Sequence, residues 1–149
     1  MFGFKQVMDS DEAKGAFSIE GGNVYINCQN KSASALNVGE VVTYDVSNGL
    51  AYQVIKPTTA TLDQVAGVVA ESIAVDGFGK VMAFGTTTAY VSGGTDVTIG
   101  DSLKAVNGVF NVIKDQASGT APSFKQHLRA LAGYTTDASA LVKVHVNCL

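Results

Sequence analysis

The sequence is poor in charged residues. Only 15% of its 149 residues are charged, whereas an ordinary soluble domain has about 25%. It carries Lys+Arg 10 and Asp+Glu 13, for a net charge of −3, so it lacks the basic excess that binding to phosphate backbones requires. A small globule needs a solvated surface. Either small polar residues solvate this one, or part of its surface is covered by a partner.

Other absences exclude further classes. No apolar stretch approaches the roughly 18 residues of a membrane-spanning helix, and a hydrophobic content of 46% is too high for an intrinsically disordered chain. The segment Met1–Glu12 has no basic region followed by an apolar core, so we expect no secretory signal. The length suits one domain, or one domain with an arm.

Cysteine and histidine are too scarce for a metal site. Cys28 and Cys148 are the only cysteines. A disulfide between them is possible, but we favour two buried thiols, as in an intracellular product. His145 and Cys148 form an H-x-x-C pattern, yet a tetrahedral site needs three or four ligands and the only other histidine is His127. In a strand these two side chains would also point to opposite faces. We therefore expect no metal and no cofactor.

The patterning predicts an all-β fold. β-branched residues dominate, and turn signals recur about every ten residues. The predicted strands are Gly22–Cys28, Val41–Asp45, Leu50–Lys56, Val65–Ile73, Lys80–Phe84, Thr87–Ser92, Asp101–Val106, Val109–Lys114, Leu128–Ala132 and Leu141–Asn147. The segment Ser123–Ala132 fits a helix as well as a strand.

Two Asn-Gly pairs predict tight two-residue hairpin turns. Such turns demand positive φ angles, which Asn48-Gly49 and Asn107-Gly108 supply. Two further turns are expected at Asp76–Gly79 and Gly93–Asp96.

The two Asn-Gly turns lie in matching surroundings, which indicates an internal repeat. In each unit an apolar residue precedes a glycine-acid pair, and a strand, a turn, a returning strand, a small-residue strand and a Lys-Val strand follow. The matched segments are Val38–Lys56 with Ile99–Lys114, Gly67–Ala70 with Arg129–Ala132, and Lys80–Ala83 with Lys143–Val146. Two such units wrapped together could close a small barrel and remove most sheet edges.

The glycine-acid pairs are Gly39-Glu40 and Gly100-Asp101. The two acids could form a catalytic carboxylate pair, but we favour a structural role in which each carboxylate caps its turn and accepts from backbone N–H groups. No phosphate-binding loop, nucleophile elbow or calcium loop is present in the sequence. We therefore expect a protein that is not an enzyme.

The order of several segments resembles the small capsid decoration, or cement, proteins of tailed bacteriophages. The segments that carry the resemblance are Gly67–Ala74, Lys80–Gly85, Gly100–Leu103, Asn107–Phe110, Ala130–Ala132 and Leu141–Val146, within roughly residues 36–147. The resemblance implies a compact β-barrel or β-clip-like domain, usually a trimer. Such trimers sit outside the head between capsomers and clamp neighbouring major capsid subunits.

Residues before the repeat are expected to form an arm. We assign 1–22 to an extended N-terminal arm and 23–149 to the barrel domain. Phe2, Phe4, Val7 and Met8 are apolar at uneven spacing, too few for a core, but suited to pockets of a partner such as capsid protein or a neighbouring subunit. Alternatively they fold back on their own barrel or stay frayed.

The sequence thus predicts a structural virion protein on the outer surface of the capsid, made in the host cytoplasm. Its expected partners are the major capsid protein and itself as a homotrimer, with no nucleic acid or membrane. One alternative is another virion surface component, such as a head fibre base, a tail element or a carbohydrate-binding module using Tyr44, Tyr52 and Tyr90. A less favoured alternative is a trimeric β-scaffold enzyme with a site drawn from Asp76, Asp96, Asp101, His127 and Arg129.

Overall fold

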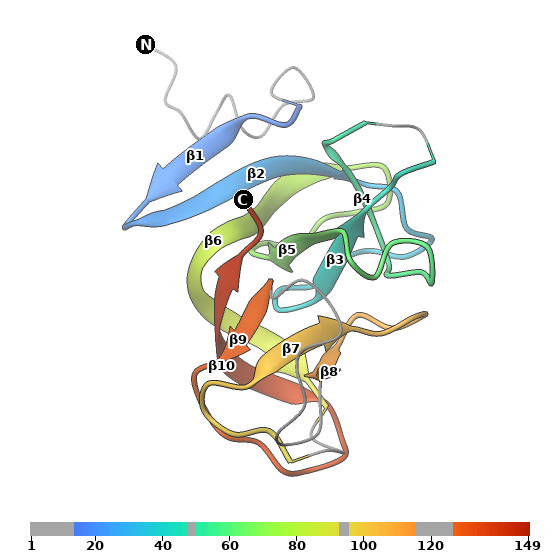
Figure 1. Ribbon diagram of the computed structural model, residues 1–149. Coiled ribbons are helices and arrows are strands. Elements are labelled where there is room, and N and C mark those ends of the chain that lie inside the picture. The colour runs from blue at the N-terminus through green and yellow to red at the C-terminus, as the bar shows by residue number, and fades with distance from the viewer. Residues whose placement is uncertain (1–13, 48–49, 93–95, 116–126) are drawn as a thin grey trace.

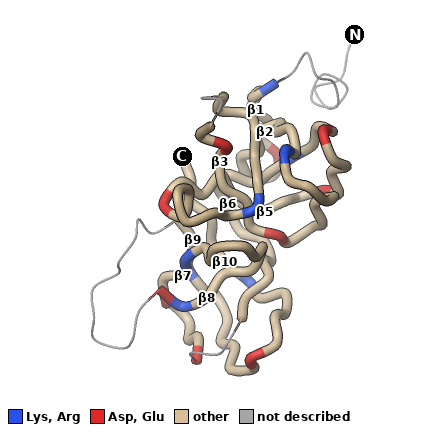
Figure 2. Tube along the Cα trace, turned by 90° about the vertical axis from the view of Figure 1, so that its right-hand side faces the viewer, with Lys and Arg blue, Asp and Glu red and all other residues tan. Residues whose placement is uncertain are grey.

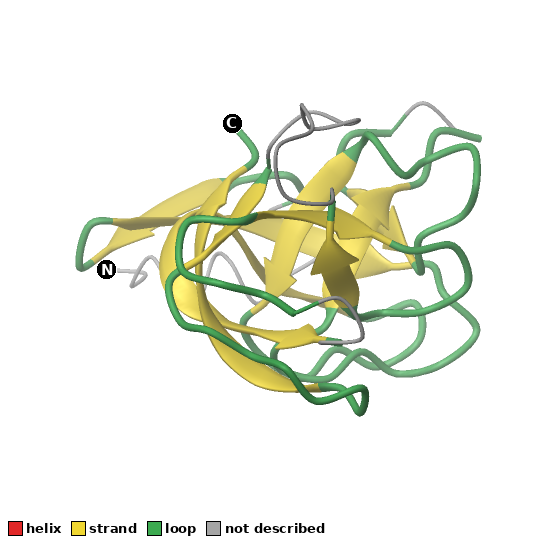
Figure 3. Cartoon of the chain, turned by 60° about the horizontal axis from the view of Figure 1, so that its bottom comes forward, coloured by secondary structure: helices red, strands yellow, loops and turns green. Residues whose placement is uncertain are grey.

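The computed structural model describes residues 14–47, 50–92, 96–115 and 127–149. These residues form strands and no helix (Figures 1 and 3), which confirms the all-β prediction. None of the described segments is a helix able to cross a membrane. The strands are β1 (Phe17–Glu20), β2 (Asn23–Asn30), β3 (Val41–Tyr44), β4 (Gln53–Ile55), β5 (Val65–Val69), β6 (Phe78–Val91), β7 (Ser102–Ala105), β8 (Val112–Lys114), β9 (Leu128–Ala130) and β10 (Ala140–Asn147).

Five strands of the first half close on themselves. β2 pairs with β4, β4 with β3, β3 with β5, β5 with β6, and β6 with β2. All these pairings are antiparallel except the short parallel contact of β2 with β4, which matches Gln29 to Gln53 and Asn30 to Val54. Closure leaves no open edge within this ring, and open edges are what make β-proteins prone to aggregate.

The second half repeats the same plan. β6 pairs with β10, β10 with β9, β9 with β7, β7 with β8, and β8 with β6 through the parallel contact of Val91 with Val112. β6 therefore belongs to both rings: its first half pairs with β2 and its second half with β10. Figure 1 shows β6 curving from one ring into the other. The structure confirms the repeated unit, but each unit closes its own barrel through the shared strand, instead of two units building one.

The repeat holds at the level of single hydrogen-bonded pairs. An isolated bridge joins Leu36 to Ile73 in the first unit, and another joins Val97 to Tyr134 in the second, 61 residues further at both ends. The repeat predicted from the sequence matches the small-residue strands one position out of register, because it aligns Gly67 with Arg129. In the structure the counterpart of Arg129 is Val68: Val41 pairs with Val68, and its counterpart Ser102 pairs with Arg129.

β6 is one long strand, although the sequence predicted two, Lys80–Phe84 and Thr87–Ser92, with a break at Gly85. The glycine bends the strand without ending it. Its φ is +134°, and a Cβ there would lie 2.1 Å from the side-chain oxygen of Asn23. The backbone N–H of Thr86 donates to that same oxygen at 3.3 Å. Asn23 thus fills the space next to the bend and supports it.

The second hairpin turns at Asn107-Gly108 as predicted, but its connection is longer than the predicted two-residue turn. β4 and β8 begin three residues later than predicted, so the β7–β8 connection runs from 106 to 111. Within it Val109 N–H donates to Val106 at 3.4 Å and Gly108 has a φ of +79°, whereas Asn107 has no positive φ. The N–H of Gly108 donates to Pro57 of the first unit at 2.8 Å. Asn48 and Gly49 lie outside the described residues.

Three other segments concern features that the sequence left open or did not predict. Leu128–Ala130 is a strand, while the first part of the ambiguous segment Ser123–Ala132 lies outside the described residues. Phe17–Glu20, within the range assigned to the arm, forms β1 and pairs antiparallel with β2. In the turn before β6, Asp76 has a φ of +60°, and Phe78 and Gly79 already belong to the strand.

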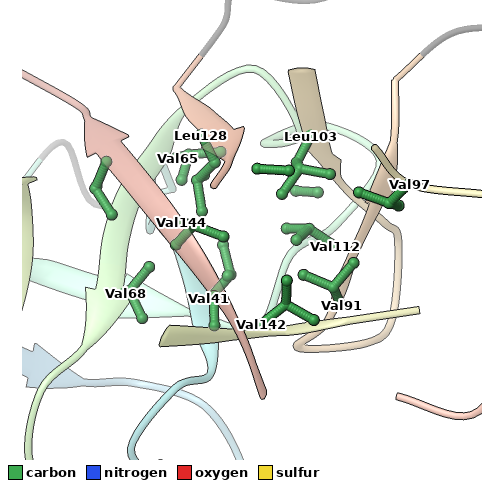
Figure 4. Packing of buried hydrophobic residues seen from close by; sticks show 14 of the residues in the cluster. Val41, Val65, Val68, Val91, Val97, Leu103, Val112, Leu128, Val142 and Val144 are labelled. Atoms are coloured by element: carbon green, nitrogen blue, oxygen red, sulfur yellow. The ribbon is translucent and has the colours of Figure 1, made fainter. Parts of the chain in front are cut away.

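The two barrels share buried apolar packing. One cluster fills the first barrel and contains Ile26, Cys28, Leu36, Val42, Val54, Ala66, Val69, Ile73, Val81 and Ala83. The other fills the second barrel, and Val41, Val65 and Val68 of the first unit pack into it (Figure 4). β3 and β5 therefore contribute to both cores from their two faces, as the alternation of side chains along a strand allows. We infer that the barrels form one cooperative domain.

Candidate interaction surfaces

The charged groups of the described residues are spread over both barrels, and several of them form ion pairs. Figure 2 shows acidic and basic residues side by side near β7 and β8. Lys80 pairs with Glu20 at 2.7 Å and Lys114 with Asp101 at 2.9 Å. In the part of the chain that the structure describes, no group of three His, Cys, Asp or Glu residues is placed to hold a metal ion.

The five residues considered for an enzyme site fall into separate environments. Asp76 pairs with Lys31 in the first unit. Asp101 and the main-chain oxygen of Asp96 both meet Lys114, at 2.9 and 3.4 Å. The Nε2 atom of buried His127 lies 3.0 Å from the main-chain oxygen of Asp63, and Arg129 is exposed on β9. The structure thus brings Asp96 and Asp101 near one lysine, and Arg129 on β9 pairs with Ser102, the residue after Asp101.

The two glycine-acid pairs build the same turn twice. The carboxylate of Glu40 accepts from the N–H of Asn37 at 2.8 Å, and that of Asp101 accepts from the N–H of Thr98 at 2.7 Å. These hydrogen bonds are the turn caps that the sequence predicts for the two carboxylates. The preceding glycines, Gly39 and Gly100, have φ angles of +91° and +92°, a region that L-residues with a Cβ rarely adopt.

The second of these turns is also held by charge. Burial raises the pKa of the Asp101 carboxyl, but hydrogen bonds from Thr98 and the neighbouring Lys114 ammonium lower it by more, so the pKa lies below its ordinary value. The charged form is therefore the one that fits this turn.

The first turn is docked onto the second barrel. The N–H of Tyr90 on β6 donates to the carbonyl oxygen of Gly39 at 2.9 Å, and the N–H of Val41 donates to Phe110 at 2.8 Å. A Cβ on Gly39 would lie 2.4 Å from Cδ2 of Leu141. The turn 37–40 thus binds the backbone N–H of Tyr90 on β6. The counterpart of Tyr90 in the first barrel is Gln29 on β2, and its N–H donates to Tyr52 of the same barrel at 2.7 Å.

Among the described residues, the second turn contacts its own barrel, where the Gly100 N–H donates to Ala130 at 2.8 Å, and no other barrel covers it. Nothing lies within 4 Å of a Cβ built on Gly100, and among the described residues no backbone N–H donates to its carbonyl oxygen. The residue before it, Ile99, exposes 74% of its surface, compared with 50% for its counterpart Val38. The sequence showed an apolar residue ahead of each glycine-acid pair, but not that one turn would be covered and the other open.

Shallow hollows lie on the surface of the described residues. One, of about 180 Å³, is at the junction of the barrels and is lined by Glu40, Tyr90, Phe110, Asn111 and Ser139. One, of about 260 Å³, lies by the β3–β4 connection and is lined by Tyr44, Asp45, Val46, Leu50, Ala51 and Gln64. The third, of about 290 Å³, is lined by Lys31, Ser32, Ala33, Ser34, Ile55, Lys56 and Thr58.

The three tyrosines considered for carbohydrate binding do not form one platform. Tyr44 lines the hollow by the β3–β4 connection, and Tyr90 lines the hollow at the junction. Tyr52 stacks on Phe78 with 6.4 Å between the ring centroids.

The cysteines are not joined in a disulfide. Cys28 is buried in the first core, and burial raises the pKa of its thiol to about 12. Burial, with the Cys28 and Cys148 thiols nearby, also raises the pKa of Tyr44 to about 12. These groups stay neutral at physiological pH and serve packing.

The proposed arm contacts Phe2, Phe4, Val7 and Met8 lie outside the described residues. Later in the range assigned to the arm, β1 carries an exposed apolar strip, in which Ile19 exposes 75% of its surface and Phe17 is also exposed, while Ser18 between them is buried.

The fold resembles that of a solved structure, but the sequence matches no known family. No family model matches the sequence, and no curated protein matches it. A solved structure with a similar course of the backbone is described as "The crystal structure of head fiber gp8.5 N base in bacteriophage phi29". It is 15% identical, with a TM-score of 0.49, over 85% of this chain and 95% of that chain.

Proposed function

We propose that this chain is a non-enzymatic structural protein of a bacteriophage particle, which binds the outside of the head between capsomers and stabilises the shell. Its partners would be the major capsid protein and further copies of itself, as a trimer. The proposal extends the sequence resemblance to decoration proteins over roughly residues 36–147. The observation that carries it is the set of large apolar side chains held exposed by a rigid, closed scaffold.

Those side chains lie mainly on loops, turns and strand ends. Besides Ile99 and Ile19 they include Phe17, Val38, Val46, Leu50, Val75, Val109, Leu141 and Leu149. Single exposed apolar residues are ordinary. In this chain, however, only 15% of the residues are charged, so few charges oppose the approach of a partner to the exposed apolar side chains. Apolar anchors on a preorganised scaffold lose little conformational entropy on binding, which favours association.

The mechanism that we propose is mass action. A protein that binds the assembled shell and not its dissociated subunits shifts the equilibrium toward the shell. Each interface can be modest, because many copies act on one particle. No group of this chain needs to perform chemistry, and the neutral, buried Cys28 and the carboxylate-capped turns then serve only to keep the scaffold rigid.

The test compares heads assembled with and without this chain. Genome release is followed by dye fluorescence during heating, and bound chain is measured by sedimentation of the particles. We expect decorated heads to release DNA at a higher temperature. Heads that bind the chain and melt unchanged would contradict stabilisation and favour a fibre base or another appendage. Heads that do not bind it would contradict the whole proposal.

A further inference from the structure

We propose that β1 is an assembly edge, along which the β1 strands of two copies of this chain pair antiparallel about a two-fold axis at Ser18. The inference deepens the proposed function, and it rests on that function only in that copies of this chain contact one another on the head. Because a contact between identical surfaces joins two copies only, it would link neighbouring trimers and would not build the trimer itself.

β1 has a neighbouring strand on one side only. Among the described residues it pairs with β2 and with no other strand, and Figure 1 shows it at the upper left edge of the first barrel. Alternate residues of an antiparallel strand direct their N–H and C=O groups to opposite sides. The N–H of Asn27 donates to the carbonyl oxygen of Ala16 at 3.0 Å, so Ala16 and Ser18 bond toward β2. Phe17 and Ile19 therefore direct their backbone groups to the open side.

The edge strand is fixed at both of its ends. At its start the N–H of Gly15 donates to the carbonyl oxygen of Asn27 at 2.9 Å. At its end the glycines 21 and 22, with φ angles of +57° and +83°, form a two-residue turn into β2. Glu20 also pairs with Lys80 of β6 at 2.7 Å. A strand held in this way loses little conformational freedom when a second strand adds to it.

The residues with outward backbone groups also expose apolar side chains. Phe17 exposes 55% of its surface, and Ile19 exposes more. Natural proteins protect edge strands with proline, with lysine or other charges, or with bulges. β1 contains no proline and no lysine, and the charge of Glu20 is compensated by Lys80. An open backbone edge with exposed apolar side chains and no such protection is a template for another strand.

A second copy fits this edge in antiparallel register. When Ser18 lies opposite Ser18 of the other copy, Phe17 of each copy faces Ile19 of the other, and each such pair exchanges both N–H to C=O bonds. An aromatic residue opposite a β-branched one is a favourable cross-strand pair. Charge favours the same direction, because Lys14 precedes the strand and Glu20 ends it. Antiparallel pairing brings opposite charges together, whereas parallel pairing would place the two Glu20 carboxylates side by side.

The first experiment removes the outward N–H of Ile19 in the full chain. Ile19→Pro should keep the hairpin with β2, because proline is tolerated in an edge strand where the N–H faces solvent, while its ring blocks a second strand. Ile19→Val is the matched control, because it keeps the N–H and an apolar β-branched side chain. In sedimentation velocity at up to about 500 μM, we expect weak dimers of wild type and of Ile19→Val, as suits so small a contact. Ile19→Pro should associate at least about fivefold more weakly.

The second experiment reads the register by cross-linking. Phe17→Cys and Ile19→Cys are made separately in a Cys148→Ser background, which removes the partly buried thiol. Hydrogen-bonded antiparallel pairs have Cα atoms about 5.5 Å apart, which a disulfide can span. In a glutathione buffer a mixture of the two variants should form a disulfide-linked heterodimer. Either variant alone should not, because identical positions lie two residues apart along the paired strands.

Several outcomes would overturn the inference. A monomeric wild type would do so, and heads that then bind Ile19→Val but not Ile19→Pro would assign the edge to a strand of the capsid protein. Equal association of Ile19→Pro and Ile19→Val, or cross-links in either cysteine variant alone, would also overturn it. If Ile19→Pro loses its hairpin, the cross-links decide.

The inference and the proposed function can fail separately. Dimers through β1 in a chain that does not bind heads would overturn the proposed function and leave this inference standing. Heads stabilised by a chain that shows no β1 pairing would do the reverse.

Discussion

The backbone N–H of Tyr90 donates to the carbonyl oxygen of Gly39 at 2.9 Å. Through this bond a turn of the first barrel occupies a main-chain position on a strand of the second. The Val41 N–H to Phe110 bond of 2.8 Å extends the same seam. Together with the shared strand β6 and the packing of Val41, Val65 and Val68 into the second core, it ties the two barrels into one structural unit.

The chain should therefore unfold in one transition. Val144 and Val81 are fully buried counterparts in the second and first cores. We expect Val144→Ala and Val81→Ala each to lower the free energy of unfolding by about 2 kcal/mol, because each leaves a cavity. Hydrogen exchange should then speed up in β3 and in β10 by similar factors in either variant. Faster exchange confined to the mutated barrel would contradict a single cooperative unit.

Gly67 should tolerate no side chain. It has a φ of +150°, and a Cβ built on it would lie 2.0 Å from the main-chain oxygen of Met82. Because that atom belongs to the neighbouring strand backbone, it cannot move aside cheaply. We expect Gly67→Ala to cost about 3 kcal/mol or more of stability, measured by urea unfolding.

The matched control for that substitution is Gly108→Ala. Gly108 also has a positive φ, +79°, but nothing lies within 4 Å of a Cβ there. It should lose only about 1–2 kcal/mol from backbone strain. Equal losses at the two glycines would show that the close approach to Met82 is unimportant.

Low pH should protonate the Asp101 carboxylate and weaken its hydrogen bonds with Thr98 in the second turn. Because the folded-state pKa of Asp101 is lowered, its contribution to stability is present above the ordinary aspartate pKa of about 3.9. It is lost as pH falls through the lower, folded-state pKa. Thermal unfolding from pH 7 to pH 2 should therefore show a smaller acid-dependent loss in Asp101→Asn than in wild type.

Lys114→Met provides the companion measurement for the pH prediction. It removes the ammonium that pairs with Asp101 at 2.9 Å and keeps the aspartate. The pKa of Asp101, followed by NMR titration, should rise toward its ordinary value in this variant. An unchanged pKa would assign the whole shift to the Thr98 hydrogen bonds.

The two thiols should react at very different rates. Cys28 is buried and its pKa is raised to about 12, so at pH 8 almost none of it is the reactive thiolate. Cys148 is only partly buried. We expect iodoacetamide to label Cys148 first in the native chain, and both cysteines after unfolding in urea, as read by peptide mass spectrometry. Rapid native labelling of Cys28 would contradict its place in the core.

Local signals located most of the strands. Runs of β-branched residues between recurring turn signals placed β2, β3, β5, β7 and β10 within a few residues, and the two Asn-Gly turns with their glycine-acid pairs marked the repeat. These features are set by side-chain periodicity and backbone freedom, which a sequence carries directly. By contrast, the sequence predicted two strands, Lys80–Phe84 and Thr87–Ser92, where the structure has one. The role of Gly85 as a bend depends on Asn23, 62 positions earlier, filling the space beside it.

The scarcity of charge, the all-β character, the repeated unit and the capping role of Glu40 and Asp101 were determined by the sequence alone. Tertiary structure decided that each unit closes its own barrel, because closure depends on the parallel contacts of β4 with β2 and of β8 with β6, which join strands far apart in the chain. It also decided which of two equal turns is buried. Gly39 meets Tyr90 and Leu141, whereas Ile99 and Gly100 face solvent, and no local pattern distinguishes a turn that has a neighbouring barrel from one that has none.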